Sequence, residues 1–248
     1  ARSAVSQMAV SAVGQRRTGC SVRSSWRAQV GLLSLAAIPA VTGTARLMEV
    51  FGGPRTMPDN PRIAGSPSPA VLHIVGGVVF LVLGALQFSP RMRQRHPTWH
   101  RRAGRALILL GITAALAALW MTLLSPRQTG TGSVLHTLRL IFGTALAGTL
   151  IVAFRAIKRG DVAQHRAWMI RAYAIALAAG TQALTIGVGE GIFGKTVLIT
   201  DLSTSAGWIV NLAVAEVILR RPSAQRPAAG NVSARGGARS PVEPRSSG

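Results

Sequence analysis

The chain has 248 residues, of which 48% are hydrophobic and 14% are charged, and its formal net charge is +21. A soluble domain typically carries about a quarter charged residues, and the apolar residues here lie in runs of the length that a bilayer requires, so the composition excludes an ordinary soluble domain. The arginines fall between these runs and in both tails, with no basic face interleaved with aromatics, which argues against nucleic-acid binding. Cys20 is the only cysteine, so an internal disulfide, a thiolate zinc site and an iron–sulfur cluster are excluded, as is covalently bound c-type haem.

In chain order, the sequence predicts a basic N-terminal segment, a six-span membrane domain and a basic tail. Residues 1–28 and 222–248 are rich in Ser, Gly, Pro, Ala and Arg, and we expect both segments to be disordered. Residues 29–221 form the membrane domain. Backbone groups find no partners in lipid, so each span must be a helix, and the expected fold class is an all-α integral membrane helical bundle. The predicted spans lie at about residues 30–50, 69–89, 103–124, 134–154, 167–187 and 202–219.

For two acidic residues near the end of the membrane domain, Asp201 and Glu216, the sequence predicts a structural role. The connection at about residues 188–203 is expected to be an outer loop that holds Asp201. Glu216 lies inside the sixth span, and an ion pair with Arg220 one helical turn later explains it most simply.

The basic residues predict the orientation of the spans. The N-terminal segment, the 91–105 loop, the 155–171 loop and the tail share one side of an up-and-down bundle, and together they carry 22 of the 28 Lys and Arg residues. Cytoplasmic loops carry the excess of Lys and Arg, so we expect a multi-pass protein with both termini in the cytoplasm.

A repeat links four histidines. His73 opens a span that ends in a basic loop, and the next span begins with His100; His136 and His165 repeat this arrangement. The core is therefore expected to be a duplicated helical hairpin. His73 and His136 share the outer leaflet, and His100 and His165 share the inner one. The second and fourth spans are diagonal neighbours in such a bundle, as are the third and fifth.

This layout predicts two bis-histidine b-type haem sites, because diagonal imidazoles at one depth can ligate an iron from opposite faces. His73 and His136 would ligate the outer iron, and His100 and His165 the inner one. Arg101, Arg102 and Arg166 would pair with the inner propionates and Arg139 with the outer ones. The alternative is that these histidines and arginines are interfacial side chains that contact lipid phosphate or snorkel to the headgroups.

The string HIVGGVVFLVLGALQFSPRMRQRHPTWHRRAGR at residues 73–105, with HRAWMIRAYAIALA at 165–178, resembles a bacterial membrane-protein family known as domain of unknown function 2306. The resemblance covers about residues 70–185, and it implies a multi-spanning protein of the bacterial inner (plasma) membrane. The placement of the four histidines is also similar to that in the diheme transmembrane cytochromes b, whose four-helix core pairs histidines between alternate helices.

Two functions follow as hypotheses. No nucleophile–base pair, phosphate loop or dinucleotide fingerprint occurs, so no catalytic residue is assigned and any enzyme role is at most that of a membrane oxidoreductase component. The first hypothesis is a diheme b-type carrier that passes electrons across the bilayer to or from a redox partner protein or a quinone, with haem b as cofactor. The alternative is a small transporter, or a lipid-interacting scaffold or subunit, without redox activity.

Overall fold

The computed structural model describes residues 2–221, with side chains from Trp26 onward except that of Ala64. This part of the chain is all-helical and contains no strand, as expected for the predicted fold class. Six helices are long and apolar enough to cross a membrane, which confirms the six spans. The helices are α1 (Arg2–Val50), α2 (Pro61–Ala64), α3 (Pro67–Gln87), α4 (Pro90–Arg95), α5 (Pro97–Leu124), α6 (Ser133–Lys158), α7 (Val162–Phe193) and α8 (Val197–Arg220).

Several helices extend beyond the predicted spans, because their ends are fixed by capping groups and not by hydropathy. The Asp161 side chain accepts the N–H of Gln164 at 2.8 Å and starts α7. Thr196 accepts the N–H of Ile199 in the same way and starts α8. These side chains satisfy backbone donors that the first helical turn leaves free. A hydropathy window does not detect such capping contacts.

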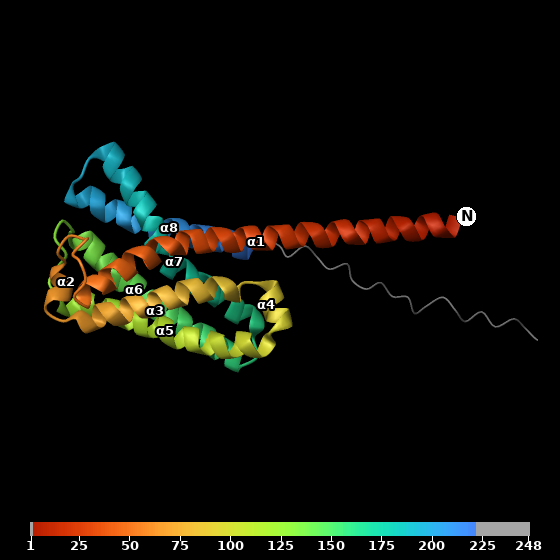
Figure 1. The fold of residues 1–248 in the computed structure, drawn as a ribbon, viewed down its shortest axis with the longest axis horizontal. Coiled ribbons are helices and arrows are strands. Elements are labelled where there is room, and N and C mark those ends of the chain that lie inside the picture. Colours follow the sequence, from red (N-terminus) through yellow and green to blue (C-terminus); the bar gives the residue numbers. More distant parts are fainter. Residues whose placement is uncertain (1, 222–248) are drawn as a thin grey trace, which may run out of the picture.

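The N-terminal helix α1 is continuous from Arg2, and its first part projects beyond the bundle (Figure 1). The sequence led us to expect no regular structure through residue 28. The predicted tail, 222–248, lies outside the described residues. The division into three segments therefore stays a prediction.

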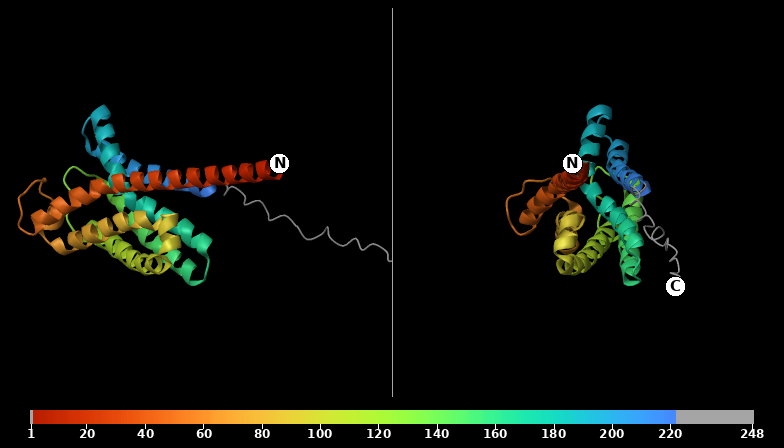
Figure 2. Two further views of the ribbon diagram at one scale, coloured as in Figure 1. Left: turned by 45° about the vertical axis from the view of Figure 1, so that its right-hand side comes forward. Right: turned by 90° about the vertical axis from the view of Figure 1, so that its right-hand side faces the viewer.

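The helices α3, α5, α6 and α7 run up and down as a four-helix core, with α1 against α3 and α7 and with α8 against α7 and α6 (Figures 1 and 2). We call the side that holds the α1–α2, α5–α6 and α7–α8 connections the loop face. The opposite side holds α4, the α6–α7 connection and the end of α8, and we call it the arginine-rich face. Which face meets the cytoplasm stays a prediction.

A compact core fills the half of the bundle nearer the arginine-rich face. Its largest members include Phe80, Leu107, Leu150 and Tyr173. Small residues let the helices approach closely there: a side chain at Gly111 would collide with Phe80 and Leu150. Such close contacts drive helix packing where lipid offers no hydrophobic contrast.

The helix α8 is attached to its neighbours by polar contacts. Glu216 pairs with Arg171 of α7 through two oxygens, at 2.6 and 3.1 Å, so the expected pair with Arg220 is wrong. The i,i+4 rule considers only residues of the same helix, so it cannot predict a partner on another helix. Asn211 adds a bond from its amide nitrogen to the Ala174 carbonyl at 3.1 Å.

Asp201 is not in a loop but inside α8, where it is 2% exposed. Its carboxylate accepts the N–H of Gly132 at 2.9 Å and that of Leu135 at 3.1 Å. It therefore caps the N-terminus of α6 from another helix, where the helix dipole favours a negative charge.

We expect Asp201→Ala to lower the unfolding free energy by about 3 kcal/mol, because two buried N–H donors lose a charged acceptor. Thermal unfolding of the purified protein measures this as a fall in the midpoint. Asp59→Ala is the control, since the Asp59 side chain is 92% exposed and lies 3.9 Å from Arg55; its effect should stay below about 0.5 kcal/mol. Equal midpoints for the two variants would refute the capping role.

Candidate functional site

The two histidines expected at the outer haem line different spaces. His73 projects from α3 into a central cavity, and its Nδ1 lies 2.9 Å from the Ala114 carbonyl of α5. His136, in the first turn of α6, lines a narrow polar crevice beside Gln128 and Arg139. The structure does not bring His73 and His136 to one cavity.

The two histidines nearer the arginine-rich face also differ from each other. His165 places its Nδ1 2.9 Å from the Ala153 carbonyl of α6. The Nδ1 of His100 is buried without a hydrogen-bond partner in the described chain, and so are both amide atoms of Gln87. Neither histidine lines the central cavity. Among the described residues, no group of three or more His, Cys, Asp or Glu side chains could hold a metal ion.

The arginines assigned to haem propionates fall into two classes. Arg101, Arg102 and Arg166 are exposed at the arginine-rich face. Arg139 is partly buried and lines both the crevice and the central cavity. Their role toward haem is untested and stays a prediction.

The central cavity lies in the loop-face half of the bundle and has a volume of about 370 Å³. That size falls within the range of small-molecule sites. Every membrane-spanning helix contributes to its wall, and so does α2. The polar or charged side chains that line it are those of Arg46, Asn60, Arg62, His73, Thr122, Arg139, Gln182 and Thr204.

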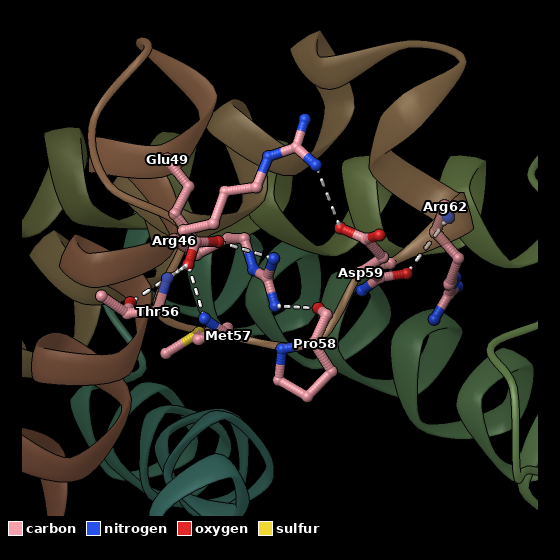
Figure 3. Close-up of polar contacts among 9 residues, drawn as sticks. Arg46, Glu49, Thr56, Met57, Pro58, Asp59 and Arg62 are labelled. Carbon is pink, nitrogen blue, oxygen red and sulfur yellow. Dashed lines mark hydrogen bonds and ion pairs between the residues drawn. The ribbon is translucent and has the colours of Figure 1, made fainter.

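One of the three arginines is neutralised at the rim. Arg46 donates to the Glu49 carboxylate at 2.7 Å and to the Pro58 carbonyl at 2.9 Å (Figure 3). The same carboxylate accepts the backbone N–H groups of Thr56 and Met57, at 2.5 and 2.7 Å. The ion pair therefore holds the α1–α2 loop beside the cavity.

The other two arginines have neutral partners. Arg62 donates to the Thr122 hydroxyl and Arg139 to the Gln128 side-chain oxygen, each at 3.0 Å. No carboxylate of the described chain lies within ion-pair distance of either. Burial lowers the pKa of the Arg62 guanidinium, because desolvation disfavours its charged form.

The Asp201 carboxylate influences Arg139 but already has hydrogen-bond partners of its own. The Asp201 charge reaches Arg139, but both its carboxylate oxygens accept backbone N–H groups at the start of α6. In addition, the side-chain nitrogen of Gln182 is buried on the cavity wall without a hydrogen-bond partner among the described residues. The cavity thus presents positive charge and, at Gln182, a hydrogen-bond donor without an acceptor in the described chain.

Sequence reasoning found part of this site. It singled out His73 and Arg139, and it missed Arg62, which lies in the predicted loop before the second span. The number of arginines on that side was visible in the sequence, but their convergence depends on how each helix is rotated about its axis.

The comparisons with known proteins place the chain among membrane proteins. A profile of the family described as "Predicted membrane protein (DUF2306)" matches residues 70–219. No curated protein and no solved structure matches the chain.

We expect a cysteine in the cavity to react faster with anionic than with cationic thiol reagents, by about tenfold, because the wall attracts anions. The variant is Ala118→Cys in a Cys20→Ser background, since Ala118 lines the cavity. Mass spectrometry of the labelled protein gives both rates. Ala153→Cys is the control, because Ala153 is 0% exposed in the packed core and should react with neither reagent. A cationic reagent that reacts as fast as the anionic one would contradict a basic cavity.

Proposed function

The chain belongs to the DUF2306 family of predicted membrane proteins, and from the cavity inside its bundle we propose that it binds an anion or an anionic headgroup within the membrane. This places it with transporters or lipid-interacting membrane proteins that have no redox activity of their own.

The observation that carries the proposal is the pair of arginines without carboxylates, Arg62 and Arg139. A buried charge is costly unless it is paired. The planar guanidinium presents a fork of donors that matches phosphate and carboxylate oxygens. An anion in the cavity would supply the acceptors that the described chain does not.

The packed core beside the cavity, against which the lining residue Leu146 packs, supports binding in place of free passage. Leu146 and Ile175 line the cavity, and next to them Phe80, Leu150 and Tyr173 pack at the bundle centre. Tyr173 also donates its hydroxyl proton to the Leu81 carbonyl at 2.8 Å and ties α7 to α3. An anion that enters from the loop face meets this packed half, so this conformation holds a ligand on one side of the bundle.

We expect inorganic phosphate to bind the full chain in nanodiscs of zwitterionic lipid. Arg139→Gln and Arg62→Gln should each weaken binding at least tenfold, or about 1.4 kcal/mol, because each removes a charged donor. Isothermal titration calorimetry measures the affinities. Arg55→Gln is the matched control, since its side chain is 84% exposed on the neighbouring loop. Unchanged binding in both cavity variants would overturn the proposal.

Two-haem electron transfer is the second candidate, and the bonds of His73 and His165 are what favour it. A carbonyl oxygen can only accept, so the Nδ1 of each ring carries the proton and Nε2 keeps its lone pair. Metal-ligating histidines are commonly oriented by such a second bond.

The remaining geometry does not fit that candidate. His136 opens into the crevice and not into the cavity that His73 lines. Near His100 and His165, the adjoining bundle centre is filled by Leu107, Leu150 and Tyr173. The proposal of anion binding therefore takes precedence over haem binding.

We expect the protein, purified after expression with ample haem, to give a reduced-minus-oxidised spectrum without bis-histidine haem bands. The structural reason is that His73 and His136 line different spaces and that neither His100 nor His165 lines the central cavity. His73→Ala and His136→Ala serve as comparisons. Bands present in the parent protein and lost in both variants would establish the second candidate.

A further inference from the structure

We propose that the ligand of the central cavity is a single-chain anionic amphiphile from the bilayer, with its head group at Arg62 and Arg139 and its chain directed toward the bundle centre. This inference rests on the proposed anion binding and adds the chemical class of the ligand. It follows from how the lining residues are ordered by depth.

The polar end of the cavity lies at the loop face. Arg139 is in the second turn of α6, and Thr122 is close to the end of α5. Arg62 reaches the same level, because it donates to the Thr122 hydroxyl at 3.0 Å. The head group of a ligand would therefore sit at the level of the membrane boundary, where water can reach its charge.

Three helices give the same depth for the cavity, measured from its polar end at the loop face toward the arginine-rich face. The lining runs from Arg139 to Leu146 on α6, from Thr122 to Ala115 on α5, and from Gln182 to Ile175 on α7. Each pair is seven positions apart in the sequence. At a rise of 1.5 Å per residue, the cavity descends about 10 Å along the bundle, room for a chain of about eight carbons.

Toward the bundle centre the wall is mainly apolar, and the exception is His73, which lines the cavity there with its Nδ1 2.9 Å from the Ala114 carbonyl. Ile74, Leu146 and Ile175 line this part of the cavity together with Trp208, which stacks on Phe142 at a centroid distance of 4.7 Å. Small side chains on α5 and α7 leave the space open, namely those of Ala115, Ala118, Ala176 and Ala179. Water in such a space would find few polar partners, and an inorganic anion would use only the end at the loop face. An alkyl chain fills the remainder with favourable contacts.

The test is a series of alkyl phosphates with chains of one to twelve carbons, titrated into the full chain in zwitterionic nanodiscs. The head group stays constant, so the series isolates the chain. We expect the affinity to rise by up to about fourfold per added methylene and to level off near eight carbons.

Two filled-cavity variants separate the protein site from partition into lipid. Ala176→Leu, six positions below Gln182, should lower the chain length at which affinity levels off, and Ala179→Leu, three positions below Gln182, should lower it further. Methyl phosphate should bind both variants as it binds the parent protein. Ala213→Leu is the matched control, because Ala213 is exposed on α8 away from the cavity.

The outcomes are distinct. A levelling point that shortens in the order of the two variants supports the amphiphile. Methyl phosphate binding that depends on Arg139, with no chain-length gain or with the same gain in all variants, overturns this inference and leaves anion binding standing. Absence of binding by every phosphate overturns both.

Discussion

A charge placed inside an apolar bundle needs a partner, because neither lipid nor packed side chains can solvate it. Several charged groups of the described spans meet this need locally. Arg46 has Glu49, and Arg171 has Glu216. Asp201 has the free N–H groups at the start of α6. Against this background Arg62 and Arg139 stand out, since their partners are a hydroxyl and an amide.

The acidic groups that have partners also determine where the central cavity lies. Asp201 ties α8 to α6 at the loop face, and Glu216 ties α8 to α7 nearer the arginine-rich face. The helix α8 thereby closes the cavity on one side and contributes Thr204 and Trp208 to its wall. The Glu49 carboxylate binds the α1–α2 loop at the rim. The acidic groups thus build the walls of a space whose interior carries unneutralised positive charge.

Hydropathy was sufficient to predict six spans, because about 20 apolar residues per crossing is a constraint of the bilayer itself. Spacing rules failed where partners come from other helices. Glu216 was assigned to Arg220 along its own helix, and Asp201 was assigned to a loop because it precedes the apolar run. His73 and His136 line different spaces for a related reason: equal depth in the membrane does not fix the direction in which a side chain points.

Two histidines at corresponding places of the repeated hairpin, His73 and His136, have different surroundings. His73 and His136 open corresponding helices of the two hairpins, but His73 bonds to the Ala114 carbonyl of α5 and lines the central cavity, whereas His136 lines the polar crevice at Gln128. The two hairpins repeat the arrangement of the helices, and the volumes of the side chains between the helices determine where a cavity remains. Phe80, Leu150 and Tyr173 fill one half of this arrangement, whereas Ala118 and Ala179 leave the other half open beside two arginines. The asymmetry between a packed half and a basic hollow half, and not the histidine symmetry, is therefore the feature on which the proposed anion binding depends.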